Sequence, residues 1–305
     1  MIKLAALAIV VGLTLPRLAL AAFATAVQPV TLPGTGIHLI PPAGMALGAA
    51  GSALVDDSGE TIIVFGTSDA KHSVENDPTW RALYKRPPEH VAMPALSGNL
   101  YRRTKAADGG TWDGWYFAVQ KGDRVLTVMA SYTGNVPGAF DRLRENLLTI
   151  TWGDNAVDSE LAMGVKLAPR GLQLVKGNVG ALSYREGGQL GGTGPSLLLQ
   201  SLPVPVGKAN AIFATDCESV VSAPFRGKPF AAPKFLSRDG IGWCETWSTM
   251  PEAEMSYVAM IRLPNGALIS AMGSALSDRF QESLPIFRAA IQNLQLIPAR
   301  LGVVR

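Results

Sequence analysis

The amino-acid sequence predicts an α+β protein made of two tandem similar domains, each an antiparallel β-sheet packed with helices. Apolar residues alternate with polar ones along several segments, apolar stripes at helical spacing follow such segments, and short motifs recur in the same order in both halves. The 305 residues exceed the usual size of one hydrophobic core, so length alone favours two domains. With 48% hydrophobic and 17% charged residues, the chain should fold without a cofactor.

The internal repeat carries the domain prediction. The first motif of each half is a glycine followed by an aliphatic alternation that ends in proline, and the later motifs follow in the same order. The matched segments are 36–41 with 164–169, Gly114-Trp115 with Gly242-Trp243, and 125–131 with 268–274. We therefore expect a signal peptide over 1–24, one copy of the domain over 25–152, a linker over 153–161 and a second copy over 162–305.

Each copy should consist mainly of strands and end in a helix. In the first copy, a hairpin is expected between 52–55 and 61–65, because Asp-Asp-Ser-Gly between them suits a turn. A short helix is expected over 76–84. The closing segments 140–150 and 287–297 are both predicted to be helical, and the apolar residues of the first fall on one stripe that could cover a sheet.

The N-terminus is typical of an export signal. Lys3 precedes an apolar run from Leu4 to Leu15, and small residues then stand at cleavage spacing, so the mature chain should begin near Ala22 or Thr25. The run is shorter than the roughly 20 residues that cross a bilayer, which favours cleavage over the alternative of an N-terminal anchor. These features predict a periplasmic or secreted protein with no stable membrane insertion after cleavage.

Two cysteines, Cys217 and Cys244, both lie in the second half. In an oxidising compartment they should pair as a structural disulfide worth about 3 kcal/mol. Two buried thiols or a redox couple are the alternatives, and the absence of a Cys-x-x-Cys spacing disfavours the redox couple.

The charge pattern and motifs exclude several functional classes. The 27 basic and 24 acidic residues nearly balance, and no long basic cluster is present, so no nucleic-acid partner is expected. No cofactor is expected, because the glycines of 187–194 precede a strand-like segment rather than a helix, which is typical of a hairpin tip and not of a phosphate loop. A metal site at His72, Glu75 and Asp77 is disfavoured, since three neighbours in one loop lack orienting partners.

A weak catalytic motif occurs at 66–70, where Gly-Thr-Ser-Asp-Ala imitates a nucleophile elbow. A serine hydrolase would need Ser68 to act with His72 or His90, because no histidine follows residue 90. A turn that ends a strand is the favoured interpretation, so no catalytic residue is assigned.

Tryptophan and tyrosine residues cluster near the paired Gly-Trp motifs. Trp115 and Trp243 are expected in the cores, where their large apolar rings would be buried. Trp112, Tyr116 and Trp247 are the candidates for aromatic residues that bind a partner, because strand alternation does not allow every ring in the cluster to face the core.

The order of these elements resembles the PsbP-like fold group. The resemblance covers nearly all of both copies and rests on the opening strand that ends at Pro41, the hairpin, the long central strands and the closing helix with Asn-Leu. The group includes the extrinsic photosystem II protein and several bacterial envelope proteins. The resemblance implies a two-layer or α-β-α unit used in binding or assembly.

The sequence therefore favours a non-enzymatic, exported binding protein with an envelope protein or a small ligand as its partner. Two alternatives stay open. One is a serine hydrolase that uses Ser68, and the other is a carrier with an apolar pocket for a small ligand.

Overall fold

A computed structural model gives the fold. It describes residues 28–69, 87–93, 96–103, 113–132, 138–154, 156–169, 171–189, 194–225, 228, 230–249 and 257–297. The predicted signal peptide, the helix expected over 76–84, Trp112 and the loop with His72, Glu75 and Asp77 all lie outside these residues. Within them, no helix is both long enough and apolar enough to cross a membrane.

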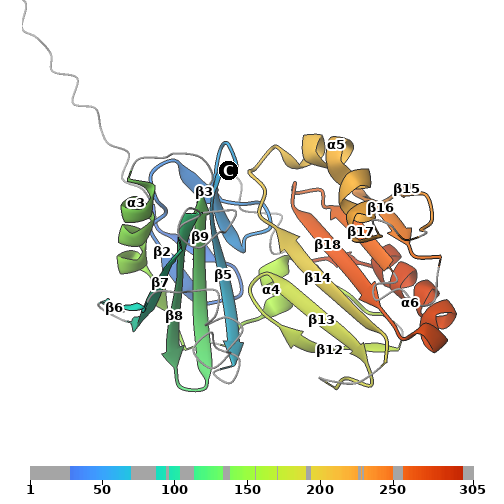
Figure 1. Cartoon of the computed structure of the whole chain (residues 1–305), viewed down its shortest axis with the longest axis horizontal. Helices are drawn as coiled ribbons and strands as arrows, with labels where there is room; N and C mark the ends of the chain where they lie inside the picture. The colour runs from blue at the N-terminus through green and yellow to red at the C-terminus, as the bar shows by residue number, and fades with distance from the viewer. Residues whose placement is uncertain are drawn as a thin grey trace, which may run out of the picture.

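The chain forms two antiparallel seven-stranded sheets, one from each half (Figure 1). The first sheet runs, from edge to edge, through β3 (Met45–Leu47), β4 (Ala53–Asp56), β5 (Thr61–Asp69), β9 (Arg124–Tyr132), β8 (Asp113–Lys121), β7 (Ser97–Arg103) and β6 (Glu89–Ala92). The second runs through β12 (Leu172–Gly177), β13 (Ala181–Glu186), β14 (Ser196–Leu202), β18 (Leu268–Ser274), β17 (Tyr257–Arg262), β16 (Ile241–Trp247) and β15 (Lys234–Arg238). The mixed α+β class is therefore confirmed, and the two sheets share one strand order.

Small sheets and helices complete both halves in a similar way. The small strands are β1 (Val30–Leu32), β2 (Ile37–Leu39) and β10 (Thr151–Trp152) in the first half, and β11 (Val165–Lys166) and β19 (Gln295–Leu296) in the second. The helices are α3 (Ala139–Glu145), η2 (Asn146–Thr149), α4 (Ser159–Met163), α5 (Ala209–Ser222), η3 (Ala223–Phe225), η4 (Ser277–Arg279) and α6 (Phe280–Gln292). In each half the opening strand pairs antiparallel with the strand that follows the closing helix, β2 with β10 and β11 with β19.

Most of the expected elements are present, with several differences in detail. The hairpin of β4 and β5 and the helical turns of 139–149 agree with the prediction. The segment 287–297 is helical only to Gln292, after which the chain turns into β19. The last residues of the expected linker open helix α4, whose N-cap Asp158 accepts a hydrogen bond from the Leu161 amide.

The paired Gly-Trp motifs do not occupy equivalent strands. When the two sheets are aligned by strand order, β8, which carries Trp115, corresponds to β17, whereas Trp243 belongs to β16. The motif match therefore paired strands that are not equivalent. Both tryptophans are nevertheless buried, as expected, with 0% and 4% of their surfaces exposed.

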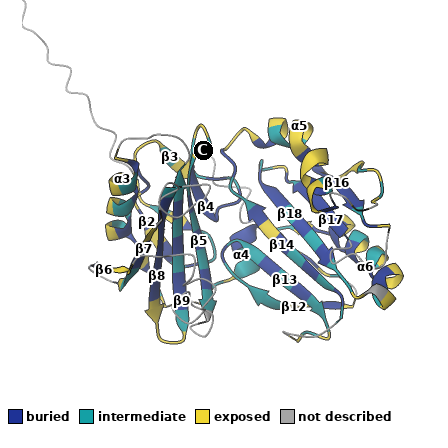
Figure 2. Ribbon diagram, in the orientation of Figure 1, coloured by how far each residue is buried: buried dark blue, intermediate teal, exposed yellow. Residues whose placement is uncertain are grey.

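The second sheet is covered on both faces by helices. Strand alternation directs Ile241, Trp243 and Glu245 toward α6, and the intervening Cys244 toward α5. Figure 2 shows the resulting burial, with dark blue strands between partly exposed helices. This half is thus an α-β-α arrangement over strands β16 and β17, since α5 packs mainly against these two.

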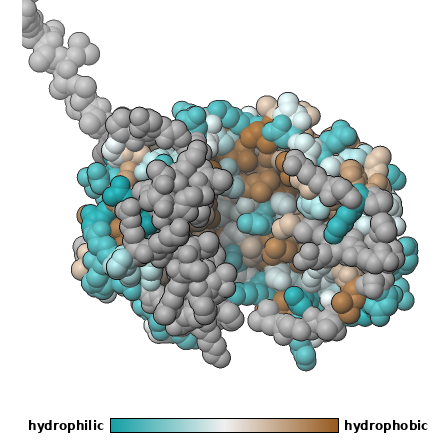
Figure 3. Space-filling model, in the orientation of Figure 1, coloured by the Kyte–Doolittle hydropathy of each residue, from teal (hydrophilic) through white to brown (hydrophobic). Residues whose placement is uncertain are grey.

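The two halves exchange buried residues where they meet. Ala50, from the turn between β3 and β4, packs in the core of the second half. Val179, from the equivalent turn between β12 and β13, is fully buried in the core of the first. Between these turns, the hydroxyls of Ser52 and Ser201 lie 2.5 Å apart in a buried hydrogen bond. Figure 3 shows apolar residues gathered in the middle of the molecule, in the region where the halves meet.

Candidate functional site

The outermost strand of the second sheet, β15, is exposed along its length. It pairs only with β16 in the described part of the chain, and all five of its residues are exposed. The strand begins a hairpin whose two turn residues, Asp239 and Gly240, both have positive φ. Such two-residue turns make their flanking residues a hydrogen-bonded pair, here Arg238 and Ile241.

The direction of the backbone groups in β15 follows from this turn. Hydrogen-bonded and non-hydrogen-bonded pairs alternate along an antiparallel ladder. Lys234, Leu236 and Arg238 therefore direct their N–H and C=O groups toward β16, whereas Phe235 and Ser237 direct theirs outward. These outward groups are the donors and acceptors that an added strand would use.

The side chains of β15 line two different surfaces. Phe235 lies on the α5 side, where its ring meets Phe213 edge to face with 6.3 Å between centroids. Leu236 is the cross-strand partner of Trp243 and so lies on the α6 side. Phe235 is 55% exposed and Leu236 is 36% exposed, so each adds apolar surface beside the free edge.

A pocket of about 360 Å³ lies on the α6 side of this edge. Its lining comes from the β15–β16 hairpin and from the chain that leaves α6: Arg238, Asp239, Ile241, Trp243, Ile291, Gln292, Asn293, Leu294, Gln295 and Leu296. Arg238 bridges these two parts, because its Nη1 donates to the Gln292 carbonyl at 3.2 Å. The lining is half polar, which suits side chains of mixed character better than a purely apolar ligand.

Behind β15, strand β16 holds a buried carboxylate. Glu245 is fully buried, and its Oε1 accepts a hydrogen bond from Arg288 Nε at 2.7 Å. Its Oε2 accepts a hydrogen bond from the Tyr257 hydroxyl at 2.9 Å. Burial, followed by the charge of Glu245, raises the pKa of Tyr257 well above its ordinary value. The tyrosine is therefore a neutral donor throughout the physiological range.

Trp247 connects this network to the surface. Its ring is half-buried, with the guanidinium of Arg288 4.8 Å from the ring centroid and the ammonium of Lys234 5.1 Å from it. Both cations lie within the distance at which an aromatic face attracts positive charge. The ring thus helps to place Lys234, a residue of the free edge.

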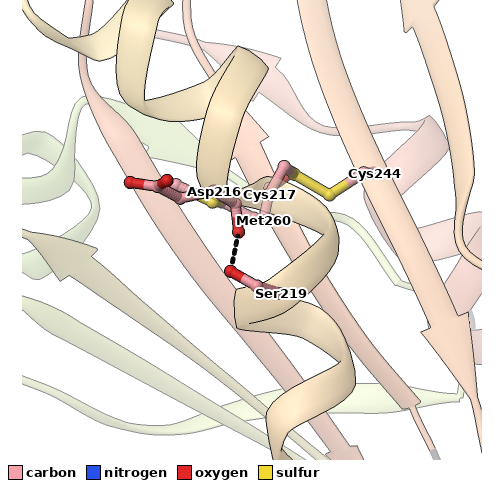
Figure 4. Close-up of a disulfide and its surroundings, with 5 residues drawn as sticks. All are labelled: Asp216, Cys217, Ser219, Cys244 and Met260. Carbon is pink, nitrogen blue, oxygen red and sulfur yellow. Dashed lines mark hydrogen bonds between the residues drawn. A yellow bond between two sulfur atoms is a disulfide. The ribbon is translucent and has the colours of Figure 1, made fainter.

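A disulfide fixes the other face of β16 (Figure 4). Cys217 of α5 is bonded to Cys244, with 6.3 Å between their Cα atoms, which confirms the expected pairing. Both residues are fully buried, in the cluster between α5 and the sheet that includes Met260. Strand β16 is therefore held on one face by a covalent bond and on the other by the Glu245 network.

The predicted aromatic candidates have different positions. Tyr116 is only 7% exposed and packs with Tyr101, so its ring offers little surface to a partner. Trp247 lies beside the free edge. Sequence reasoning missed β15 itself, although Asp239-Gly240 between two strand-like segments is a strong hairpin signal.

Two of the hydrolase candidates, Ser68 and His90, are far apart in the sheet, and His72 lies outside the described residues. Ser68 lies within β5, paired with Val125, so residues 66–69 continue the strand and do not form the expected turn. His90 lies on β6, at the edge of the sheet. Four strand spacings separate β5 from β6, or about 19 Å at roughly 4.8 Å each. Ser68 and His90 therefore cannot act together as they are placed.

The remaining motifs carry no chemical constellation in the described residues. The glycine-rich segment connects β13 to β14, as expected for a hairpin. No group of three or more His, Cys, Asp or Glu residues there is arranged to hold a metal ion. A scan against protein-family models found no match to this chain, and neither did a search of curated proteins.

Proposed function

We propose that the protein is an exported, non-enzymatic binding protein that takes up an extended segment of an envelope protein as an eighth strand beside β15. The observation that carries this proposal is the free edge itself. Phe235 and Ser237 direct their backbone groups outward from a strand that is exposed along its whole length. Strand addition supplies main-chain hydrogen bonds from such groups, and pockets beside the edge select side chains.

The fold supports the wider parts of the proposal. The shared strand order, with the same pairing of opening and final strands, is what a duplicated PsbP-like unit would give. The disulfide fits a protein that works outside the reducing cytosol. The fastening of β16 on both faces keeps the edge in one conformation, which lowers the entropy lost on binding.

Proline substitution at two matched positions tests the proposal. Ser237→Pro removes an outward N–H from β15 and leaves the ladder to β16 intact. The matched control is His90→Pro on β6. The Met93 amide donates to the Leu96 carbonyl there, and by the same alternation His90 also faces outward.

The probe is a displayed library of unstructured nine-residue peptides, selected on the disulfide-bonded protein. We expect selected peptides to lose binding to Ser237→Pro and to keep it with His90→Pro and Ser237→Ala. The same thermal unfolding midpoint in all variants shows that the fold is retained. Selected peptides that bind Ser237→Pro as well as the unchanged protein would contradict the proposal.

A further inference from the structure

The α6 side of β15 carries a pattern of two positive charges around an apolar residue. The three residues whose side chains lie on this side are Lys234, Leu236 and Arg238, in the order cation, apolar, cation. All three are exposed. Directly opposite residues on neighbouring strands have side chains on the same face, close enough for opposite charges to stabilise the pair and for like charges to destabilise it.

From this pattern we infer that the site recognises an extended segment in which two carboxylates flank an apolar residue at alternate positions. The segment has the form acidic–x–apolar–x–acidic, with the carboxylates opposite Lys234 and Arg238 and the apolar side chain opposite Leu236. The pattern reads the same in both chain directions, so a parallel and an antiparallel segment both satisfy it. The inference rests on the proposed capture of a strand at this edge.

The same charges argue against a second copy of this chain as the occupant. Antiparallel self-pairing that uses all five residues of β15 places Lys234 of each copy opposite Arg238 of the other. Two pairs of like charges would then meet across the new interface, which destabilises it. A partner that brings carboxylates to these positions replaces the repulsion by attraction.

Local contacts hold both cations in place for this role. Lys234 lies over the Trp247 ring, and Arg238 bonds to the Gln292 carbonyl and to Asp239. The acidic neighbour Asp239 belongs to the turn and not to the strand. Glu245, the cross-strand partner of Lys234, is fully buried and is paired with Arg288. Lys234 and Arg238 are therefore the charges that the strand presents.

Two synthetic peptides of the same composition test the inference by calorimetry. The first is Thr-Thr-Glu-Thr-Leu-Thr-Glu-Thr-Thr. In the second, Thr-Thr-Thr-Glu-Leu-Glu-Thr-Thr-Thr, each glutamate is moved by one residue and so points to the opposite face. We expect the first peptide to bind about tenfold more tightly than the second. The double variant Lys234→Glu/Arg238→Glu should instead prefer a version of the first peptide with lysines in place of the glutamates.

The outcomes separate the inference from the proposed function. Equal binding of the two peptides, with loss of both in Ser237→Pro, would overturn the charge pattern and leave strand capture standing. Unchanged binding of the first peptide to Ser237→Pro, or of a version N-methylated at the amides that face β15, would overturn both. Loss on N-methylation together with the tenfold preference supports both without altering the protein.

Discussion

The edge strands β6 and β15 occupy the same position in two sheets of the same strand order, yet their side chains are attached to their own halves to different extents. Strand β6 places Val91 in the core of the first half, with 5% exposed, and its Glu89 is ion-paired with Arg144 of α3. Strand β15 buries none of its residues. Strand order therefore fixes where an edge lies, while the side chains determine how firmly the edge strand is attached to its own half.

The strands behind these edges also differ. Strand β16 carries the disulfide to α5 and the buried Glu245, and both cysteines of the chain belong to the second half. A strand fixed from both faces makes a rigid support for an exposed neighbour. The comparison predicts that the second half depends most strongly on these fastenings, and four changes test it.

The largest effect is expected from loss of the disulfide. Replacing Cys217 and Cys244 by alanine should lower the free energy of unfolding by about 3–4 kcal/mol, because the unfolded chain regains the entropy of an open loop. Urea unfolding with and without reductant measures this. Reductant should lower the midpoint of the unchanged protein and have no effect on the double variant. An unchanged midpoint in reduced protein would show that the bond does not support this half.

Removing the cation of the buried network should cost nearly as much. Arg288→Met leaves Glu245 fully buried without its ion-pair partner and should destabilise the protein by about 3 kcal/mol. The double variant Glu245→Gln/Arg288→Met should recover much of this loss, because the buried group is then neutral. Equal stability of the single and double variants in urea unfolding would contradict this account of the network.

Because each half buries a turn residue in the core of the other, a substitution in one half should destabilise the other half. Val179→Ala changes a residue of the second half but creates a cavity in the core of the first, and should cost about 1–3 kcal/mol. The free energy of unfolding in urea measures the loss. Val206→Ala, at a residue that is 55% exposed, is the matched control and should change little. An unchanged free energy of unfolding in Val179→Ala would contradict the burial of this turn in the first half.

The smallest effect is expected at the edge strand β6. Arg144→Ala breaks the ion pair with Glu89. The side chains of Arg144 and Glu89 are 37% and 54% exposed, so the free energy of unfolding should fall by less than about 1 kcal/mol. A double-mutant cycle with Glu89→Gln measures the pair directly. A coupling well above this value would mean that the ion pair, and not the burial of Val91, is the main attachment of β6 to the first half.

The sequence predicted the class of fold because it depends on local patterns, and the disulfide because the chain has only two cysteines and a predicted export signal. Alternation and turn residues gave the hairpin of β4 and β5, and the apolar stripe gave the closing helix. Matching Gly114-Trp115 with Gly242-Trp243 failed because a two-residue motif does not specify which strand carries it. The exchange of Ala50 and Val179 between cores could not be predicted, since it depends on packing between distant segments.

The site was predictable only in part. Trp247 was a candidate from its place in the aromatic cluster, and the structure puts it beside the free edge. That β15 is the last strand of its sheet is a property of topology, which depends on contacts between segments far apart in the chain. The position of Glu245 beneath Trp247 likewise appears only once α6 is packed on the sheet.

Hydrogen exchange of the individual amides of β15, with and without the acidic peptide, tests the central claim most directly. In the free protein, the Phe235 and Ser237 amides should exchange rapidly, and those of Lys234, Leu236 and Arg238 more slowly, because only the latter bond to β16. Binding should protect Phe235 and Ser237 and little else. Protection that appears elsewhere while these two amides continue to exchange rapidly would contradict strand capture at this edge.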